Sequence, residues 1–256
     1  MTESAYPSPH RTFDDLEDQR ASLIVTVDGP SGAGKSTMAR MLACKLGFKY
    51  VDTGALYRAV GWFVLKKGLD PTKDEDLRLA CESMDLQVKW DEKGKMLVFV
   101  GGEDITSEIR TESMGMMASI VSAKRVVREH LWRVQRGLGR LGRMVFEGRD
   151  MGTRVFPEAP VRFFLTADAE ERARRRWKEL RAQGQEVEFE EVSSTMMRRD
   201  EQDSSREIAP LEVPHGAIVI DTTRLAPEEV LELMVREVTS RTPLCGISQG
   251  GVSQEH

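Results

Sequence analysis

Short apolar runs alternate along the chain with longer stretches in which apolar residues recur at every third or fourth position. Residues 35–46 show this helical spacing, and Gly47 is placed to end that helix. A second helix is predicted over residues 55–67. The apolar runs predict short strands at 23–27, 48–51, 144–146, 161–165 and 217–220. Strands separated by helices indicate a parallel sheet covered on both faces, which binds ligands at the carboxyl ends of its strands.

One section departs from this alternation. Residues 86–90 and 96–100 are two apolar-rich runs joined by the turn sequence Asp91-Glu92-Lys93-Gly94, which is typical of an antiparallel hairpin. Inserted into a parallel core, such a hairpin would suit a flap over a second substrate. We therefore predict an inserted segment over residues 81–121.

A second unusual section, residues 172–191, is rich in arginine. We expect a mobile, cationic lid there, with Arg172, Arg175 and Arg176 facing a bound anion. The alternative is an ordinary solvated helix whose charges pair four residues apart, as Glu171 and Arg175 would.

The length and composition indicate one main domain. A chain of 256 residues with 40% hydrophobic residues can bury one large core, which we place at residues 21–240. The polar ends, residues 1–20 and 241–256, show no periodicity and are predicted to be disordered tails.

The net charge and the cysteine content restrict the cellular compartment and the classes of binding partner that we expect. A net charge of −5 argues against a nucleic acid polymer as partner, since such binding needs many uncompensated cations. The three cysteines show no CxxC pairing, which favours a reducing, cytoplasmic location. No apolar run approaches the roughly 20 residues that a membrane helix requires. We expect a monomer that acts on small molecules and has no membrane partner.

The most informative motif lies directly after the first predicted strand. Residues 29–36 fit the phosphate-binding template G-x-x-x-x-G-K-[ST] without a mismatch. The glycines let backbone N–H groups surround an anion, Lys35 supplies a charge to the β and γ phosphates, and the Ser36 hydroxyl can ligate Mg²⁺. The predicted ATP-binding set is Gly29, Pro30, Ser31, Gly32, Ala33, Gly34, Lys35, Ser36 and Thr37.

Phosphoryl transfer also requires arginines that neutralise the charge on the transferring group. Arg149 is the strongest candidate, because it follows an apolar strand and so lies at the edge where ligands bind. Any of these arginines could instead form a surface salt bridge. The further candidates are Arg58, Arg110, Arg198, Arg199 and Arg206.

Five segments, in order along the chain, resemble those of the bacterial cytidylate kinases. The block Gly148-Arg149-Asp150-Met151-Gly152-Thr153 is the most specific, because phosphate loops occur in many unrelated nucleotide-binding proteins. The resemblance extends from about residue 23 to residue 238. The other segments are DGPSGAGK at 28–35, DTGALYR at 52–58, EIR at 108–110 and IAPL at 208–211.

The resemblance implies a three-layer P-loop fold with a central parallel sheet, the hairpin insertion as the monophosphate-binding part, and a helical lid. It also implies a cytoplasmic enzyme of pyrimidine metabolism that transfers the γ-phosphoryl group of MgATP to CMP or dCMP. By this resemblance Lys35, Arg149 and Asp150 are catalytic, and Ser36 ligates the metal.

The same resemblance assigns substrate contacts. The acceptor phosphate would be held by Thr53, Arg58, Arg149 and Arg206, with Arg110 also in the substrate site. The cytosine edge would be read by Ser119, Arg128 and Asp150, and the sugar would meet Arg199 and Asp203. An acid that accepts from cytosine N4 beside an arginine that donates to the ring would disfavour uracil, whose edge is reversed.

Two rival interpretations remain. One is another P-loop kinase of small molecules, of the UMP, AMP or shikimate type. The other is a nucleotide-operated switch, which the chain disfavours because it contains no asparagine for a guanine-reading Asn-Lys-x-Asp motif. The chain also departs from the family at Glu147, where relatives commonly carry aspartate, and this leaves its part in placing Mg²⁺ open.

Overall fold

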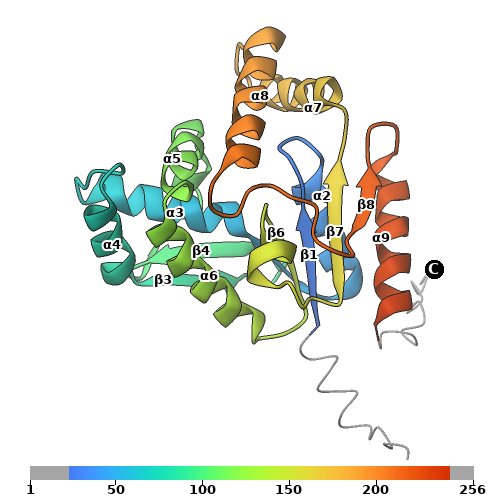
Figure 1. Ribbon diagram of the computed structural model, residues 1–256, viewed down its shortest axis with the longest axis horizontal. Coiled ribbons are helices and arrows are strands. Elements are labelled where there is room, and N and C mark those ends of the chain that lie inside the picture. Colours follow the sequence, from blue (N-terminus) through green and yellow to red (C-terminus); the bar gives the residue numbers. More distant parts are fainter. Residues whose placement is uncertain (1–22, 243–256) are drawn as a thin grey trace, which may run out of the picture.

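The computed structural model of the protein describes residues 23–242 and is built on a five-stranded parallel sheet with helices on both faces (Figure 1). The strand order is β2-β6-β1-β7-β8. The predicted α/β fold is therefore confirmed, and each predicted strand is present within a few residues. The strands are β1 (Ile24–Asp28), β2 (Lys49–Asp52), β6 (Met144–Glu147), β7 (Val161–Thr166) and β8 (Ile218–Asp221).

Helices bury the two faces of this sheet in separate apolar clusters. On one face, α2 (Lys35–Leu46) and α9 (Pro227–Arg241) pack on the alternate residues of β1, β7 and β8. On the other face, β6 packs with α3 (Thr53–Lys66), α4 (Asp74–Ser83), α5 (Glu112–Ser122) and α6 (Arg125–Gly139). Helix α3 begins two residues earlier than predicted, because the Asp52 carboxylate accepts a hydrogen bond from the Ala55 N–H and caps it.

The antiparallel hairpin is present. Strands β3 (Leu86–Trp90) and β4 (Met96–Val100) pair antiparallel, and the two-residue strand β5 (Glu103–Asp104) adds a third member that is too short to leave a sequence pattern. Alternate residues of β4 are buried against the cluster that contains α3. The short helix η1 (Glu108–Arg110) follows and leads into α5.

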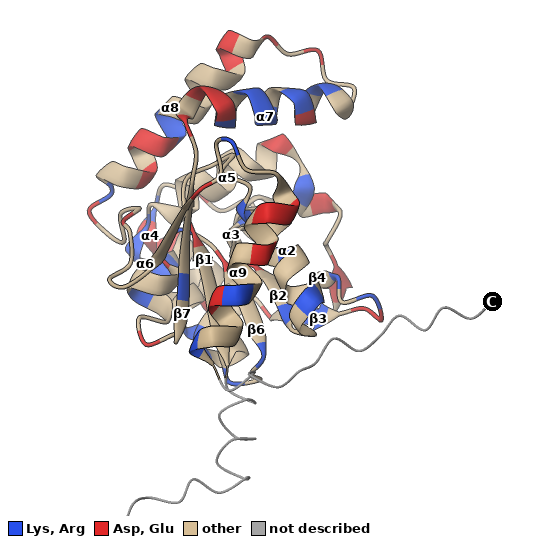
Figure 2. Ribbon diagram, turned by 90° about the vertical axis from the view of Figure 1, so that its right-hand side faces the viewer, with Lys and Arg blue, Asp and Glu red and all other residues tan. Residues whose placement is uncertain are grey.

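The arginine-rich section is helical, as the resemblance implied. Helices α7 (Ala169–Ala182) and α8 (Phe189–Ser205) form a pair beyond the carboxyl end of the sheet (Figure 1). A small apolar cluster that includes Trp177 and Met196 holds the pair together. Two acidic residues open α7 and mostly basic residues follow them (Figure 2), and Glu171 and Arg175 pair at 3.0 Å, as expected for charges four residues apart on a helix.

The ends of the chain lie mainly outside the described residues, and with them the predicted disordered tails at 1–20 and 243–256. The first two residues of the predicted C-terminal tail are ordered: Arg241 closes α9, and the buried Thr242 donates a hydrogen bond to the Val238 carbonyl at 2.6 Å. Across residues 23–242, no helix is both long and apolar enough to cross a membrane.

Strand register sets up the site. Glu147 pairs in register with Val27 of β1 and with Asp52 of β2. The residues that follow these strands therefore converge at one edge of the sheet, which is where a parallel sheet binds ligands.

Candidate active site

The loop between β1 and α2 requires glycine for steric reasons. Gly29 has φ +142°, and a Cβ there would lie 2.0 Å from the Leu165 carbonyl oxygen. A Cβ on Gly32 would lie 2.8 Å from the Arg172 carbonyl oxygen. Gly34, with φ +83°, immediately precedes the first residue of α2. The loop is thus pressed against neighbouring backbone, and the N-terminus of α2 presents its free N–H groups as an anion site.

Lys35 is buried at the base of this loop. Its Nζ donates a hydrogen bond to the Pro30 carbonyl at 2.7 Å. Burial lowers the pKa of Lys35 well below its usual value, and the charge of Arg149 adds to the effect while Glu147 opposes it. An anion bound in the loop would offset this cost and favour the charged lysine.

Ser36 meets Glu147, the residue that ends β6. The Ser36 hydroxyl donates to Glu147 Oε1 at 2.7 Å, and the Tyr50 hydroxyl donates to Oε2 at 2.6 Å. Thr53 donates to the Glu147 backbone carbonyl at 2.6 Å. Tyr50 was not singled out from the sequence, because β2 and β6 are distant in the chain and become neighbours only in the fold.

Arg149 and Arg206 converge on a single acid. Arg149 Nε donates to Asp203 Oδ2 at 2.9 Å, and Arg206 pairs with the other oxygen of the same carboxylate. Burial is the main cause of a lowered pKa at Arg149 and at Arg206, whose pKa falls to about 10. Two half-buried guanidinium groups share one carboxylate, so this cluster has spare positive charge for an anionic ligand.

A second buried pair joins Arg128 and Asp150. The two side chains meet at 3.0 Å, and each is only 2% exposed. Trp132, which the sequence did not single out, donates to the same Asp150 oxygen at 2.9 Å. Arg128 Nε donates to the Ser122 carbonyl, and the guanidinium lies 5.6 Å from the centre of the Tyr57 ring. These contacts fix the orientation of Asp150.

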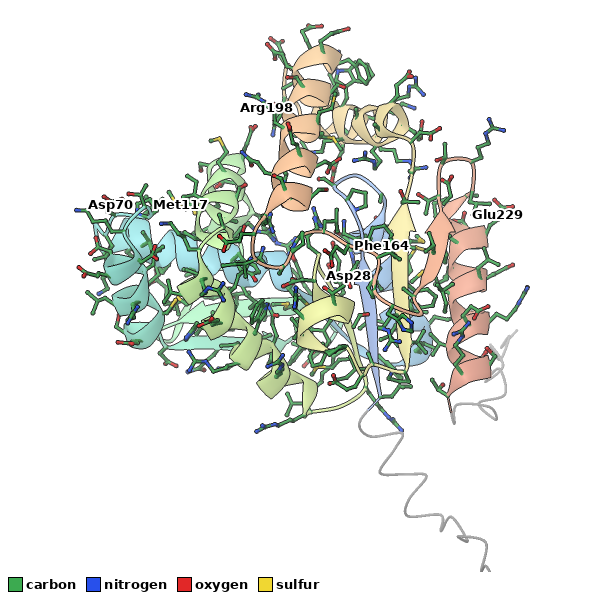
Figure 3. The ribbon with its side chains drawn as sticks, in the orientation of Figure 1. Asp28, Asp70, Met117, Phe164, Arg198 and Glu229 are labelled. Atoms are coloured by element: carbon green, nitrogen blue, oxygen red, sulfur yellow. The ribbon has the colours of Figure 1, made fainter. Side chains whose placement is uncertain are left out.

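Asp28 anchors the segment that follows Asp150. Its two oxygens accept hydrogen bonds from the N–H groups of Met151 and Gly152 at 2.9 and 2.7 Å. These residues begin η2 (Met151–Val155), a wide π-helical turn. Figure 3 shows Asp28 near the middle of the molecule, at the end of β1. Burial raises its pKa to about 7, against the opposing effect of the two backbone hydrogen bonds.

The predicted lid arginines divide into two groups. Arg172 donates to the Ser31 carbonyl at 3.1 Å and pairs with Asp200, so it connects the phosphate loop to α8. Arg175 instead binds Glu171 and Thr222, and Arg176 pairs with Glu179. The contacts with Glu171 and Glu179 hold the side chains of Arg175 and Arg176 along α7 rather than at the phosphate loop.

The other predicted residues differ in how closely they join the site. Arg58 pairs with Asp52 at 2.7 Å. Arg199 is exposed, yet the surrounding protein, followed by the charges of Arg149 and Arg58, lowers its pKa to about 10. Ser119 donates to Gln202 at 3.4 Å across the space between α5 and α8.

Two predicted arginines lie apart from the cluster of Arg149, Arg206 and Asp203. Arg110 is exposed on η1, and none of the hydrogen bonds or ion pairs among residues 23–242 involves its side chain. Arg198 is exposed on α8 and reaches Thr195 at 3.5 Å (Figure 3). We find no support in the geometry for an anion contact by either residue in this conformation.

The phosphate loop, the neighbouring acid at the end of β6 and the converging arginines define a P-loop kinase. Comparison with known proteins gives the family: the model of the cytidylate kinase family matches residues 25–240. The chain belongs to the cytidylate kinase family.

Curated relatives carry the same name. A cytidylate kinase of Geobacter sulfurreducens is 47% identical over 88% of this chain and 97% of its own length. One of Caldicellulosiruptor bescii is 46% identical over 81% of this chain and 92% of its own. Among solved structures, a shikimate kinase of Bacteroides thetaiotaomicron covers 85% of this chain and 97% of its own with 12% identity and a TM-score of 0.45. A likeness at that level supports no argument about function.

Proposed function

We propose that the enzyme transfers the γ-phosphoryl group of MgATP to CMP or dCMP, with the phosphate loop holding ATP and the arginine cluster holding the acceptor phosphate. The observation that carries this proposal is the gathering of cations beside the phosphate loop: buried Lys35, half-buried Arg149 and Arg206, and exposed Arg199. The surrounding protein and the charges of neighbouring arginines lower the pKa of Lys35, Arg199 and Arg206. A multiply charged anion bound there would offset that repulsion.

The acceptor side draws on three groups of residues. Arg58, Arg149 and Arg206 supply guanidinium groups that bind phosphate oxygens in pairs, and Thr53 lies beside them at the start of α3. Asp150 would accept from the cytosine N4 amino group while Arg128 and Ser119 face the ring. Arg199 and Asp203 would meet the sugar. The acceptor phosphate is itself an anionic nucleophile, so no general base is needed.

The residues around Ser36 fit a magnesium ion. The Ser36 hydroxyl places one oxygen ligand beside the phosphate loop, with Glu147 as its hydrogen-bond acceptor, and oxygen is the ligand that Mg²⁺ prefers. Residues 23–242 contain no group of three or more His, Cys, Asp and Glu that could enclose a metal, which suits an ion held mainly by nucleotide phosphates. Ser36 would hold this ion, which would supply positive charge to neutralise the transferring phosphoryl group.

Helices α7 and α8 would act as a lid, and the segment 81–121 as the acceptor-side flap. Arg172 already contacts both the loop and α8, and Ser119 and Gln202 meet between α5 and α8. Closure would exclude water, which otherwise competes for the phosphoryl group. We further infer that the enzyme acts as a monomer, because every assigned residue belongs to one chain, and that it acts in the cytoplasm, because the three cysteines show no CxxC pairing.

A product assay tests this function. The purified chain is mixed with MgATP and, in separate reactions, with CMP, dCMP, UMP, AMP or shikimate, and the phosphorylated products are identified. We expect diphosphates from CMP and dCMP, and much slower turnover of the others. Turnover of AMP or shikimate without turnover of CMP would refute the proposal.

Lys35→Ala should remove most of this turnover, because the loop would lose the charge that neutralises the transferring phosphoryl group. The expected loss is on the order of a hundredfold or more in kcat, as for other charges directed at a transition state. Initial rates with saturating CMP and MgATP measure it. Near-normal turnover would refute the role of Lys35.

A further inference from the structure

Tyr50 lies on β2, outside every group of residues assigned above, yet its hydroxyl is committed to the Ser36–Glu147 contact. It donates to Glu147 Oε2 at 2.6 Å while Ser36 occupies Oε1. The Tyr50 hydroxyl is the donor in this contact, so the contact depends on the phenol oxygen and not only on the ring.

The position of Tyr50 follows from strand pairing. β2 runs parallel to β6, with Tyr50 beside Val145 and Asp52 beside Glu147. The rigid ring of Tyr50 thus extends along the sheet toward the end of β6. The Glu147 carboxylate is held between one donor from β2 and one donor from α2, so its orientation is fixed from two elements of the core.

This arrangement has a chemical consequence for Ser36. A serine hydroxyl that ligates a cation uses an oxygen lone pair, and its proton must be directed at an acceptor. Glu147 Oε1 is that acceptor. A donor on the opposite oxygen prevents the carboxylate from rotating away or approaching the bound phosphates directly.

We propose that Tyr50 is a positioning residue for the donor site: through Glu147 it orients the Ser36 hydroxyl so that its oxygen faces the cation bound with ATP. The inference rests on the proposed function for the presence of that cation. It predicts that Tyr50 contributes to the affinity for MgATP and not to the affinity for metal-free ATP or for CMP.

Titration calorimetry without an acceptor substrate tests this inference. ATP is titrated into the wild-type chain and into Tyr50→Phe, with Mg²⁺ in one series and a chelator in the other. Loss of such an outer ligand contact typically weakens metal binding by roughly 10–100-fold, and we expect about tenfold weaker MgATP binding. Binding of metal-free ATP and of CMP should change less than about twofold. Equal weakening with and without Mg²⁺ would overturn the inference.

Tyr57→Phe is the matched control. The Tyr57 hydroxyl is also buried, but it has no hydrogen-bond partner among the described residues, so its removal breaks no such contact. We expect this variant to keep the wild-type ratio of MgATP to ATP affinity. The same loss of Mg²⁺ dependence in Tyr57→Phe would overturn the inference.

A double-mutant cycle shows whether Tyr50 acts through Glu147. In a Glu147→Ala background the Tyr50→Phe change should have no further effect on MgATP affinity, because the intermediate carboxylate is gone. A persisting tenfold effect would overturn the inference. Failure of the proposed function is distinguishable, since it would appear as a wild-type chain that forms no CDP.

Discussion

At the scale of single residues, the candidate active site contains buried charged groups, and their neighbours offset only part of the free-energy cost of burying them. Asp150 illustrates this: Arg128 and Trp132 hold one of its oxygens, and within residues 23–242 no side-chain donor holds the other. The carboxylate therefore has a fixed orientation before substrate binds, which is the condition for reading a base edge by hydrogen bonds.

Asp150→Asn should chiefly damage selection between cytosine and uracil. The amide turns with an N–H₂ or a C=O toward the base at similar cost, whereas the carboxylate only accepts. A hydrogen bond to a charged group contributes about 1.5–3 kcal/mol, so the ratio of kcat/KM for CMP over UMP should fall by roughly 10–100-fold. Steady-state kinetics with both nucleotides measure this ratio, and an unchanged ratio would refute the role of Asp150 in base selection.

Asp28 predicts a pH dependence of stability. Burial raises the pKa of its carboxyl from 3.8 to about 7, so the folded protein holds this proton more tightly than the unfolded chain. Its contribution to stability is complete below about pH 4 and is lost as the pH rises through 7. The free energy of unfolding of the wild type, minus that of Asp28→Asn, should therefore decrease between pH 5 and about 7 and then become constant. Denaturant unfolding across that range measures the difference, and a difference that rises with pH would contradict the assignment.

At the scale of elements, the positions before and after α2 require glycine for two different reasons. Gly29 lies against the Leu165 backbone, whereas Gly47, at the end of α2, has open space around its Cβ position and only a positive φ. An alanine at position 29 would have a strained backbone and would also collide with the Leu165 carbonyl, whereas an alanine at position 47 would have the strained backbone alone.

Gly29→Ala should therefore be much more damaging than Gly47→Ala. We expect the second change to cost about 1 kcal/mol of stability, as for a residue held in the left-handed region. The first should cost several times as much or displace the loop, with loss of ATP binding. Thermal unfolding and ATP titration of both variants measure this, and equal effects on stability would contradict the packing argument.

At the scale of the whole molecule, the main elements of the fold could be predicted from the apolar pattern, because strands such as β7 and helices such as α2 are buried on a regular period. The packing of the lid helices could not be predicted, because a run of arginines has the same sequence pattern whether or not Trp177 packs against α8. Tyr50, Trp132 and Asp28 could not be assigned, because their roles arise from strands and helices distant in sequence. Lys35, Arg149 and Asp150 belong to motifs that are continuous in sequence, so they could be identified as candidates before the fold was known.

The proposed function requires one site to hold an ATP phosphate chain and a cytidine phosphate facing each other. The most direct test is the dissociation constant of a bisubstrate compound in which adenosine and cytidine are joined by a pentaphosphate, compared with its diadenosine counterpart. We expect the cytidine compound to bind at least about tenfold more tightly, because only cytosine forms hydrogen bonds with both Asp150 and Arg128. Equal or weaker binding of the cytidine compound would contradict the proposed function.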